Sequence, residues 1–226
     1  MTERFLHHLR VELPAPEETA ADARVRLADK FPRTAVRRMT HLGLLIGSAL
    51  DGASLGPEDA LVYASTFAET RALEEFLLSF PAASPSLFQT SIHPGGVQQV
   101  LIGRQQPIAR FWPHAGCRRL VEQALMTALI EPARRVALVG GEERGTWMLE
   151  HHMASTSSFA FAAIMTHEPA GAAGRIAFTP DPQTDDACPT LEFFAEALAG
   201  RCLMNWHGGG GAWTLEWFHL NASGAH

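Results

Sequence analysis

The stretch QPIARFWPHAGCRRLVEQAL, residues 106–125, joins a short apolar run to a long amphipathic segment and decides the fold class. Residues 107–112 have the length and apolar content of a strand. Residues 114–130 have the pattern of a helix, with apolar side chains at Leu120, Val121, Ala124, Leu125, Ala128 and Leu129. This stripe is wider than a surface helix needs, so we expect the helix to be deeply buried.

Strands and helices alternate outward from this stretch. Residues 1–32 predict a short strand, a loop and a lead-in. The other predicted strands are residues 61–65, 136–139, 158–166, 175–178 and 213–218, and the other predicted helices are residues 33–50, 69–80, 97–102 and 190–198. The alternation up to residue 140 predicts an α/β fold whose mixed sheet is mostly parallel, with helices on both faces. The later strands predict antiparallel pairing.

The composition indicates a globular protein of 226 residues with 46% apolar and 19% charged residues. Its 18 basic and 24 acidic residues give a net charge of −6, which argues against a nucleic-acid-binding face. Cys117, Cys188 and Cys202 form no CxxC pair, so we expect neither a disulfide framework nor a structural zinc site. No apolar stretch approaches the roughly 20 residues of a membrane span, and no secretory signal is evident. We therefore expect a cytoplasmic protein.

Four segments, in this order, resemble the N-terminal half of a β-ketoacyl synthase of the thiolase superfamily. They are LVYASTFAE (residues 61–69), SPSLFQTSIHPGG (84–96), QPIARFWPHAGCRRLVEQAL (106–125) and RRVALVGGEE (134–143). The third is similar to the strand and helix around the synthase nucleophile, and the fourth to a strand that ends in Gly-Gly-x-Glu. The nearest subgroup is the short, chain-length-factor-like proteins associated with aryl polyene, fatty-acid and polyketide pathways.

The resemblance implies one thiolase-like half-fold over residues 1–226. Residues 1–32 would be a lead-in, residues 33–166 the core, and residues 167–226 a C-terminal extension that packs on the core. It also implies a non-condensing accessory subunit without a cofactor, which shapes or stabilises a partner synthase or contacts an acyl carrier protein.

The residue of this chain that aligns with the synthase nucleophile is not a cysteine. Aligned on Leu120 and Val121, that position falls on Gly116, one residue before Cys117; aligned on Pro107, it falls near Ala115. One residue turns a helical side chain by about 100°, so we expect Cys117 to face away from the acyl channel. Independent catalysis is therefore not expected.

An alternative enzyme function uses the H-x-x-C pair formed by His114 and Cys117. At the start of a helix, the imidazole and the helix dipole would activate the thiolate of an acyltransferase or thioesterase. The competing interpretation is a buried structural cysteine, with His114 capping the helix.

Arg33, Arg37 and Arg38 on the first predicted helix are candidates for docking an acidic acyl carrier or its phosphopantetheine phosphate. Solvated or structurally paired arginines are the alternative. The HGGGG run at residues 207–211 lacks the GxSxG motif that would accompany an oxyanion element, so it predicts a turn. The adjacent pairs at residues 7–8 and 151–152 lack metal-ligand spacing, and no metal site is expected.

A half-fold would leave one apolar face of the helix predicted at residues 114–130 exposed to water. At about 25 cal/mol per Å², an uncovered apolar patch of several hundred Å² costs on the order of 10 kcal/mol. The cover could be the tail with Trp206, Trp213, Trp217 and Phe218, a second copy of the chain, or a catalytic synthase subunit. We expect a homodimer or a heterodimer with a β-ketoacyl synthase, paired through residues 107–112. The interface candidates are Ile108, Phe111 and Trp112.

Overall fold

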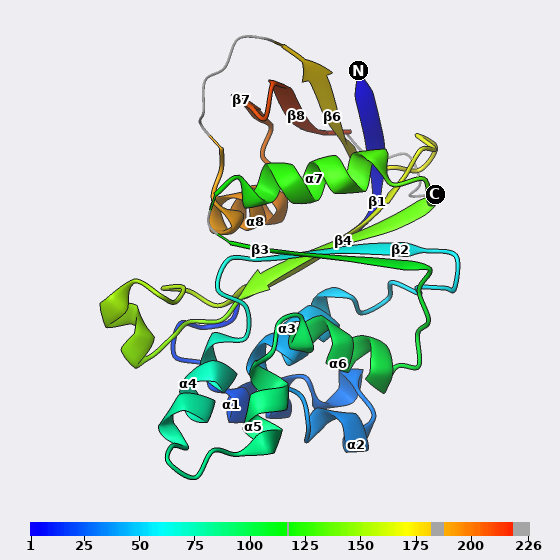
Figure 1. Cartoon of the computed structure of the whole chain (residues 1–226). Helices are drawn as coiled ribbons and strands as arrows, with labels where there is room; N and C mark the ends of the chain where they lie inside the picture. The colour runs from blue at the N-terminus through cyan, green and yellow to red at the C-terminus, as the bar shows by residue number, and fades with distance from the viewer. Residues whose placement is uncertain (117, 182–187, 219–226) are drawn as a thin grey trace.

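One mixed sheet, ordered β3-β2-β4-β5-β1-β6-β8-β7, organises the chain (Figure 1). The computed structural model describes residues 1–116, 118–181 and 188–218. Its strands are β1 (Thr2–Glu12), β2 (Ala60–Ser65), β3 (Arg110–Ala115), β4 (Arg135–Glu142), β5 (Phe159–Thr166), β6 (Gly174–Pro180), β7 (Met204–Gly208) and β8 (Gly211–Trp217).

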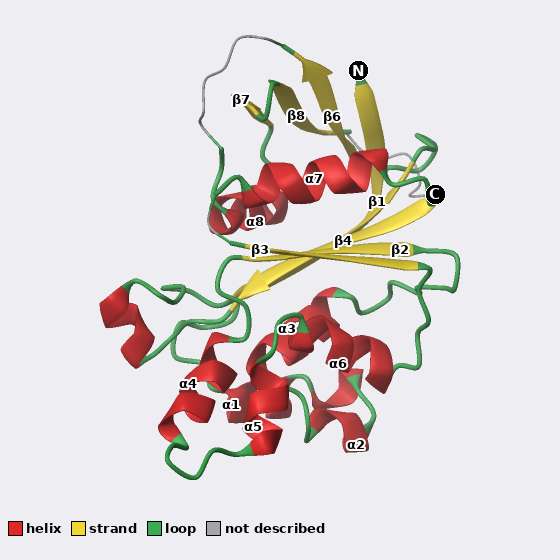
Figure 2. Ribbon diagram, in the orientation of Figure 1, coloured by secondary structure: helices red, strands yellow, loops and turns green. Residues whose placement is uncertain are grey.

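The helices lie on both faces of this sheet (Figure 2). They are α1 (Ala20–Arg26), α2 (Arg33–Val36), α3 (His41–Ala49), α4 (Thr70–Leu78), α5 (Pro85–Ser91), α6 (Gly95–Gly103), α7 (Leu120–Ile130) and α8 (Leu191–Gly200), with 3₁₀ turns at Ala28–Lys30 and Trp147–His151. The first six helices form one layer, and α7 and α8 lie on the opposite face. None of the helices in the described ranges is long and apolar enough to cross a bilayer.

The α/β class, the mixed sheet and the two helical faces are confirmed, but the parallel part is smaller than predicted. Among the named strands, parallel pairing is confined to β2 and its neighbours β3 and β4. The other described pairs are antiparallel. The main reason is β1, which was expected to be a short lead-in strand. It spans 11 residues and lies in the sheet between β5 and β6, antiparallel to both.

Two predicted helices have different boundaries in the structure. The helix expected at residues 33–50 is interrupted, and α3 begins anew after Thr40, whose hydroxyl accepts a 3.1 Å hydrogen bond from the Gly43 N–H. The helix expected to start at residue 114 starts at Leu120, because β3 continues to Ala115. Gly116 (φ +120°) and Arg119 (φ +55°) have left-handed backbone conformations that a helix does not accommodate. His114 is therefore a strand residue and not a helix cap.

The C-terminal tail covers the apolar face of α7. Residues of α7, α8, β6, β7 and β8 share one hydrophobic core, on the face opposite the core of α1, α3 and α6. Trp213 is 1% exposed, and its ring stacks on that of Trp206 at 5.7 Å. The chain thus supplies its own cover, and the argument for a partner from an uncovered α7 face does not hold.

Replacing Gly140 on β4 by alanine is expected to destabilise the fold by about 2 kcal/mol, the range for overpacked cores. A Cβ atom there would lie 2.4 Å from the ring of Phe161 and 3.2 Å from the carbonyl oxygen of Ala64. Urea unfolding of Gly140→Ala measures the loss. Gly56→Ala is the control, because the nearest atom to its Cβ position is 3.9 Å away. Equal stability of the two variants would contradict the expected clash.

Candidate functional site

A cavity of about 340 Å³ opens where β2 and β4 end, beside the first residues of α7 and α8. Ligands of open α/β sheets bind at this carboxyl edge of the strands. The cavity is lined by Thr66, Phe67, Leu120, Glu142, Ala154, Ser155, Thr156, Phe159, Pro189, Thr190, Leu191 and Glu192. This described lining contains neither a cysteine nor a histidine.

Glu142, the last residue of β4, places a buried carboxyl group on the cavity wall. Its oxygens accept hydrogen bonds from the backbone N–H groups of Thr66 and Phe67, the latter at 3.1 Å. Burial raises the pKa of Glu142 to about 7, although those hydrogen bonds favour the ionised form. The carboxyl group therefore holds the loop after β2 in place and exchanges its proton near neutral pH.

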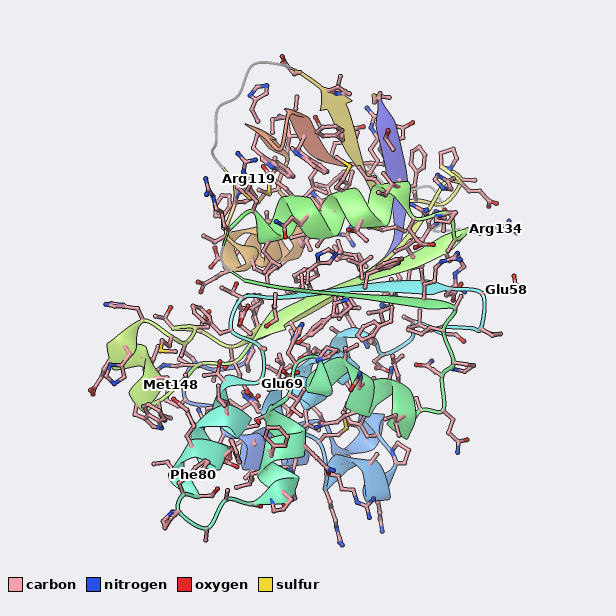
Figure 3. The ribbon with its side chains drawn as sticks, viewed as in Figure 1. Glu58, Glu69, Phe80, Arg119, Arg134 and Met148 are labelled. Carbon is pink, nitrogen blue, oxygen red and sulfur yellow. The ribbon has the colours of Figure 1, made fainter. Side chains whose placement is uncertain are left out.

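Two more buried carboxyl groups lie on the helical side of the same strand ends. Glu143 accepts hydrogen bonds from the backbone N–H groups of Leu42 (3.2 Å) and Arg71 (2.8 Å). Glu69 accepts one from Gly96 at 2.6 Å and is marked in Figure 3, between the helical layer and the strands. Burial raises the pKa of both carboxyl groups to about 7.

His93 and Tyr63 adjoin this acidic cluster. The two rings stack with centroids 5.1 Å apart, and His93 Nδ1 lies 3.8 Å from Glu69 Oε2. Burial lowers the pKa of His93. Sequence reasoning missed this group, because His93 comes from a different segment than Tyr63 and Glu69, and only the fold brings the three side chains together. The available signal was Gly-Gly-Glu-Glu at the end of a buried strand.

The predicted nucleophile region lies in the turn between β3 and α7. Nothing lies within 4 Å of a Cβ atom built on Gly116, so there is room for a side chain at this position. The backbone conformation, with its positive φ, is what favours glycine here. Cys117 lies outside the described residues. His114 lines a different cavity of about 430 Å³ with Arg119, which Figure 3 marks at the start of α7. Burial lowers the pKa of His114.

The other predicted site residues lie apart from the 340 Å³ cavity. Arg33, Arg37 and Arg38 are exposed on and after α2. Ile108 and Phe111 are half-buried against the helix-side core, whereas Trp112 is 43% exposed and donates from Nε1 to Glu131 Oε2 at 2.7 Å.

Two further expectations can be compared with the structure. The turn predicted for the HGGGG run is confirmed: Gly209 and Gly210, both with positive φ, connect β7 to β8. Over residues 1–116, 118–181 and 188–218, no three His, Cys, Asp or Glu side chains gather in an arrangement that could hold a metal ion.

Structural comparison places the fold among known proteins. The chain superposes on a chain of "Ketosynthase (ApeO) in Complex with its Chain Length Factor (ApeC)" from Xenorhabdus doucetiae with a TM-score of 0.65 and 18% identity, covering 96% of this chain and 99% of that one. It matches the ishigamide ketosynthase/chain length factor with a TM-score of 0.56 and 12% identity, covering 80% and 68% of the two chains.

A β-ketoacyl synthase from Burkholderia phymatum matches with a TM-score of 0.53 and 11% identity, covering 81% of this chain and 66% of that one. No family model matches the sequence, and no curated protein matches it. The chain therefore has a thiolase-like fold, related by structure to ketosynthases and chain length factors.

Proposed function

We propose that this protein is a chain-length-factor-like accessory subunit, without condensing activity of its own, in fatty-acid, polyketide or aryl polyene biosynthesis. The observation that carries the proposal is the extent of the structural match. The chain covers 99% of a chain from a ketosynthase–chain length factor complex, but 66% of the β-ketoacyl synthase.

The turn before α7 supports a non-condensing role. Condensation needs an activated thiolate. Gly116, the residue aligned with the synthase nucleophile, occupies this turn and has no side chain to supply one. The 340 Å³ cavity would then receive or shape an acyl chain that a partner elongates.

Strand β3 is our proposed contact with a partner synthase, or with a second copy of this chain. It is an edge strand of the sheet, paired with β2 alone. A free edge presents unpaired N–H and C=O groups to another strand. Trp112 adds a large exposed aromatic ring to this strand, with half-buried Phe111 and Ile108 as further candidates, and aromatic side chains dominate the energetics of interfaces. Arg33, Arg37 and Arg38 remain our candidates for docking an acyl carrier protein.

Co-expression with a β-ketoacyl synthase encoded nearby tests the proposal. We expect the two chains to co-purify and the product length to change when this chain is omitted. Incubation with an acyl-pantetheine probe, read by mass spectrometry, tests the alternative. Labelling of Cys117 would favour an acyltransferase or thioesterase, and a stable monomer that binds neither synthase nor carrier would refute the accessory role.

Trp112→Arg is expected to weaken the association about thirtyfold, since loss of a central interface aromatic costs about 2 kcal/mol. The arginine can still donate to Glu131, so the fold should persist. Sedimentation of the mixed chains measures the dissociation constant. The control is Phe193→Arg on α8, where a 56% exposed aromatic ring lies away from β3. Equal effects of both variants would contradict pairing through β3.

A further inference from the structure

Three arginines from separate segments line one small cavity in the helical layer. The arginine cavity, defined by Arg24 on α1, Arg38 before α3 and Arg71 on α4, has a volume of about 200 Å³. Its remaining lining is Ala20, Met39, Thr40, His41, Ala72, Glu75, Leu87, Thr90 and Glu143. It is distinct from the 340 Å³ cavity at the strand ends, with which it shares no lining residue.

None of these three guanidinium groups forms a salt bridge in the described part of the chain. Arginines elsewhere do pair with carboxylates, for example Arg10 with Asp51 at 2.6 Å. Arg24 donates to the carbonyl oxygen of Met39, and Arg71 to that of Arg144, each at 3.2 Å. The Nε atom of Arg24 is buried and has no hydrogen-bond partner. The guanidinium groups of these arginines therefore retain N–H donors and positive charge for a ligand in this cavity.

The acidic groups in the lining form no salt bridge with the three arginines in the described residues, although the charge of Arg71 acts to lower the pKa of Glu143. Glu143 uses both carboxyl oxygens to accept backbone N–H groups, from Leu42 and from Arg71. Glu75 is exposed and forms no salt bridge with the three arginines. His41 faces Glu18, with its Nε2 atom 3.4 Å from Oε1, and burial lowers its pKa. The lining thus carries three permanent cations against two carboxyl groups, one of which is already engaged.

We propose that the arginine cavity binds a phosphate group, as free phosphate or as a small phosphate monoester. Planar guanidinium forks match phosphate oxygens and form strong, charge-assisted hydrogen bonds. A volume of about 200 Å³ equals that of about seven liquid waters, which suits a phosphate with a few waters. This inference does not depend on the accessory role proposed above.

Calorimetric titration of the full chain with inorganic phosphate tests the inference, and a parallel titration with glycerol 3-phosphate distinguishes the two sources. We expect saturable binding to one site. Arg38→Gln and Arg71→Gln should each weaken it at least tenfold, because a hydrogen bond to a charged group is worth about 1.5–3 kcal/mol. Arg38 is exposed, so its replacement leaves the core unchanged.

The matched control is Arg118→Gln, which removes the same charge from an exposed residue outside the arginine cavity. Wild-type affinity in this variant, together with weak binding by Arg38→Gln, would support the site. The inference is overturned by an absence of saturable binding, or by equal weakening in Arg118→Gln and Arg38→Gln, which would indicate attraction by net charge alone.

Discussion

Replacing Trp213 by alanine is expected to destabilise the protein by about 3–5 kcal/mol, the range for removing a fully buried large aromatic ring. Trp213 lies on β8, where its ring contacts that of Phe178 at 4.7 Å and stacks on Trp206. Its Nε1 atom donates to the carbonyl oxygen of Gly208 at 3.1 Å. The substitution therefore opens a cavity in the layer that covers α7.

Thermal and urea unfolding of Trp213→Ala measure this loss, with Trp147→Ala as the control. Trp147 lies in a 3₁₀ turn outside both cores and is partly exposed, so its removal should cost much less. Sedimentation of Trp213→Ala measures, as a second readout, whether the variant self-associates. If stability were unchanged, the tail would not be the cover that α7 needs.

Glu143→Ala is expected to destabilise the protein by about 3 kcal/mol. The change removes the acceptor of two backbone N–H groups, from Leu42 at the start of α3 and Arg71 at the start of α4. Each buried donor left without a partner costs about 1–3 kcal/mol. Glu143→Gln retains one acceptor oxygen and should lose less. A smaller loss in Glu143→Ala than in Glu143→Gln would show that Glu143 does not anchor these two helices.

The same residue predicts a pH dependence of stability. Burial raises the pKa of Glu143 in the folded chain to about 7, above its ordinary value of 4.5. Between these values the folded chain retains a proton that the unfolded chain has lost, so stability falls as pH rises from about 4.5 to about 7. The free energy of unfolding of Glu143→Gln should fall less across this window. Parallel curves for the two proteins would contradict this assignment.

The buried carboxyl groups also explain how the candidate site is built. Glu142 holds the loop after β2, Glu143 holds the starts of α3 and α4, and Glu69 holds the start of α6. These contacts link the helical layer to the ends of the parallel strands. The loop of Thr66 and Phe67, which bounds the 340 Å³ cavity, is therefore held in place by Glu142.

Much of the fold follows from local sequence. The apolar runs of β2 and β4 and the stripe of α7 were predictable, because burial on one or both faces selects apolar residues at the spacing of each element. The turn at Gly209 and Gly210 was predictable as well, because glycine readily adopts a positive φ. The resemblance to a thiolase-like half rested on these same segments.

Tertiary contacts determined the rest. The length of β1 was not predicted, because its polar, half-buried residues lack the apolar pattern of a core strand. Its pairing partners, β5 and β6, lie more than a hundred residues away in the sequence. The start of α7 depended on two left-handed backbone conformations rather than on its apolar stripe. The acidic cluster and the arginine cavity bring together side chains from separate elements. Such groupings depend on long-range packing, and residue spacing within one segment carries no information about them.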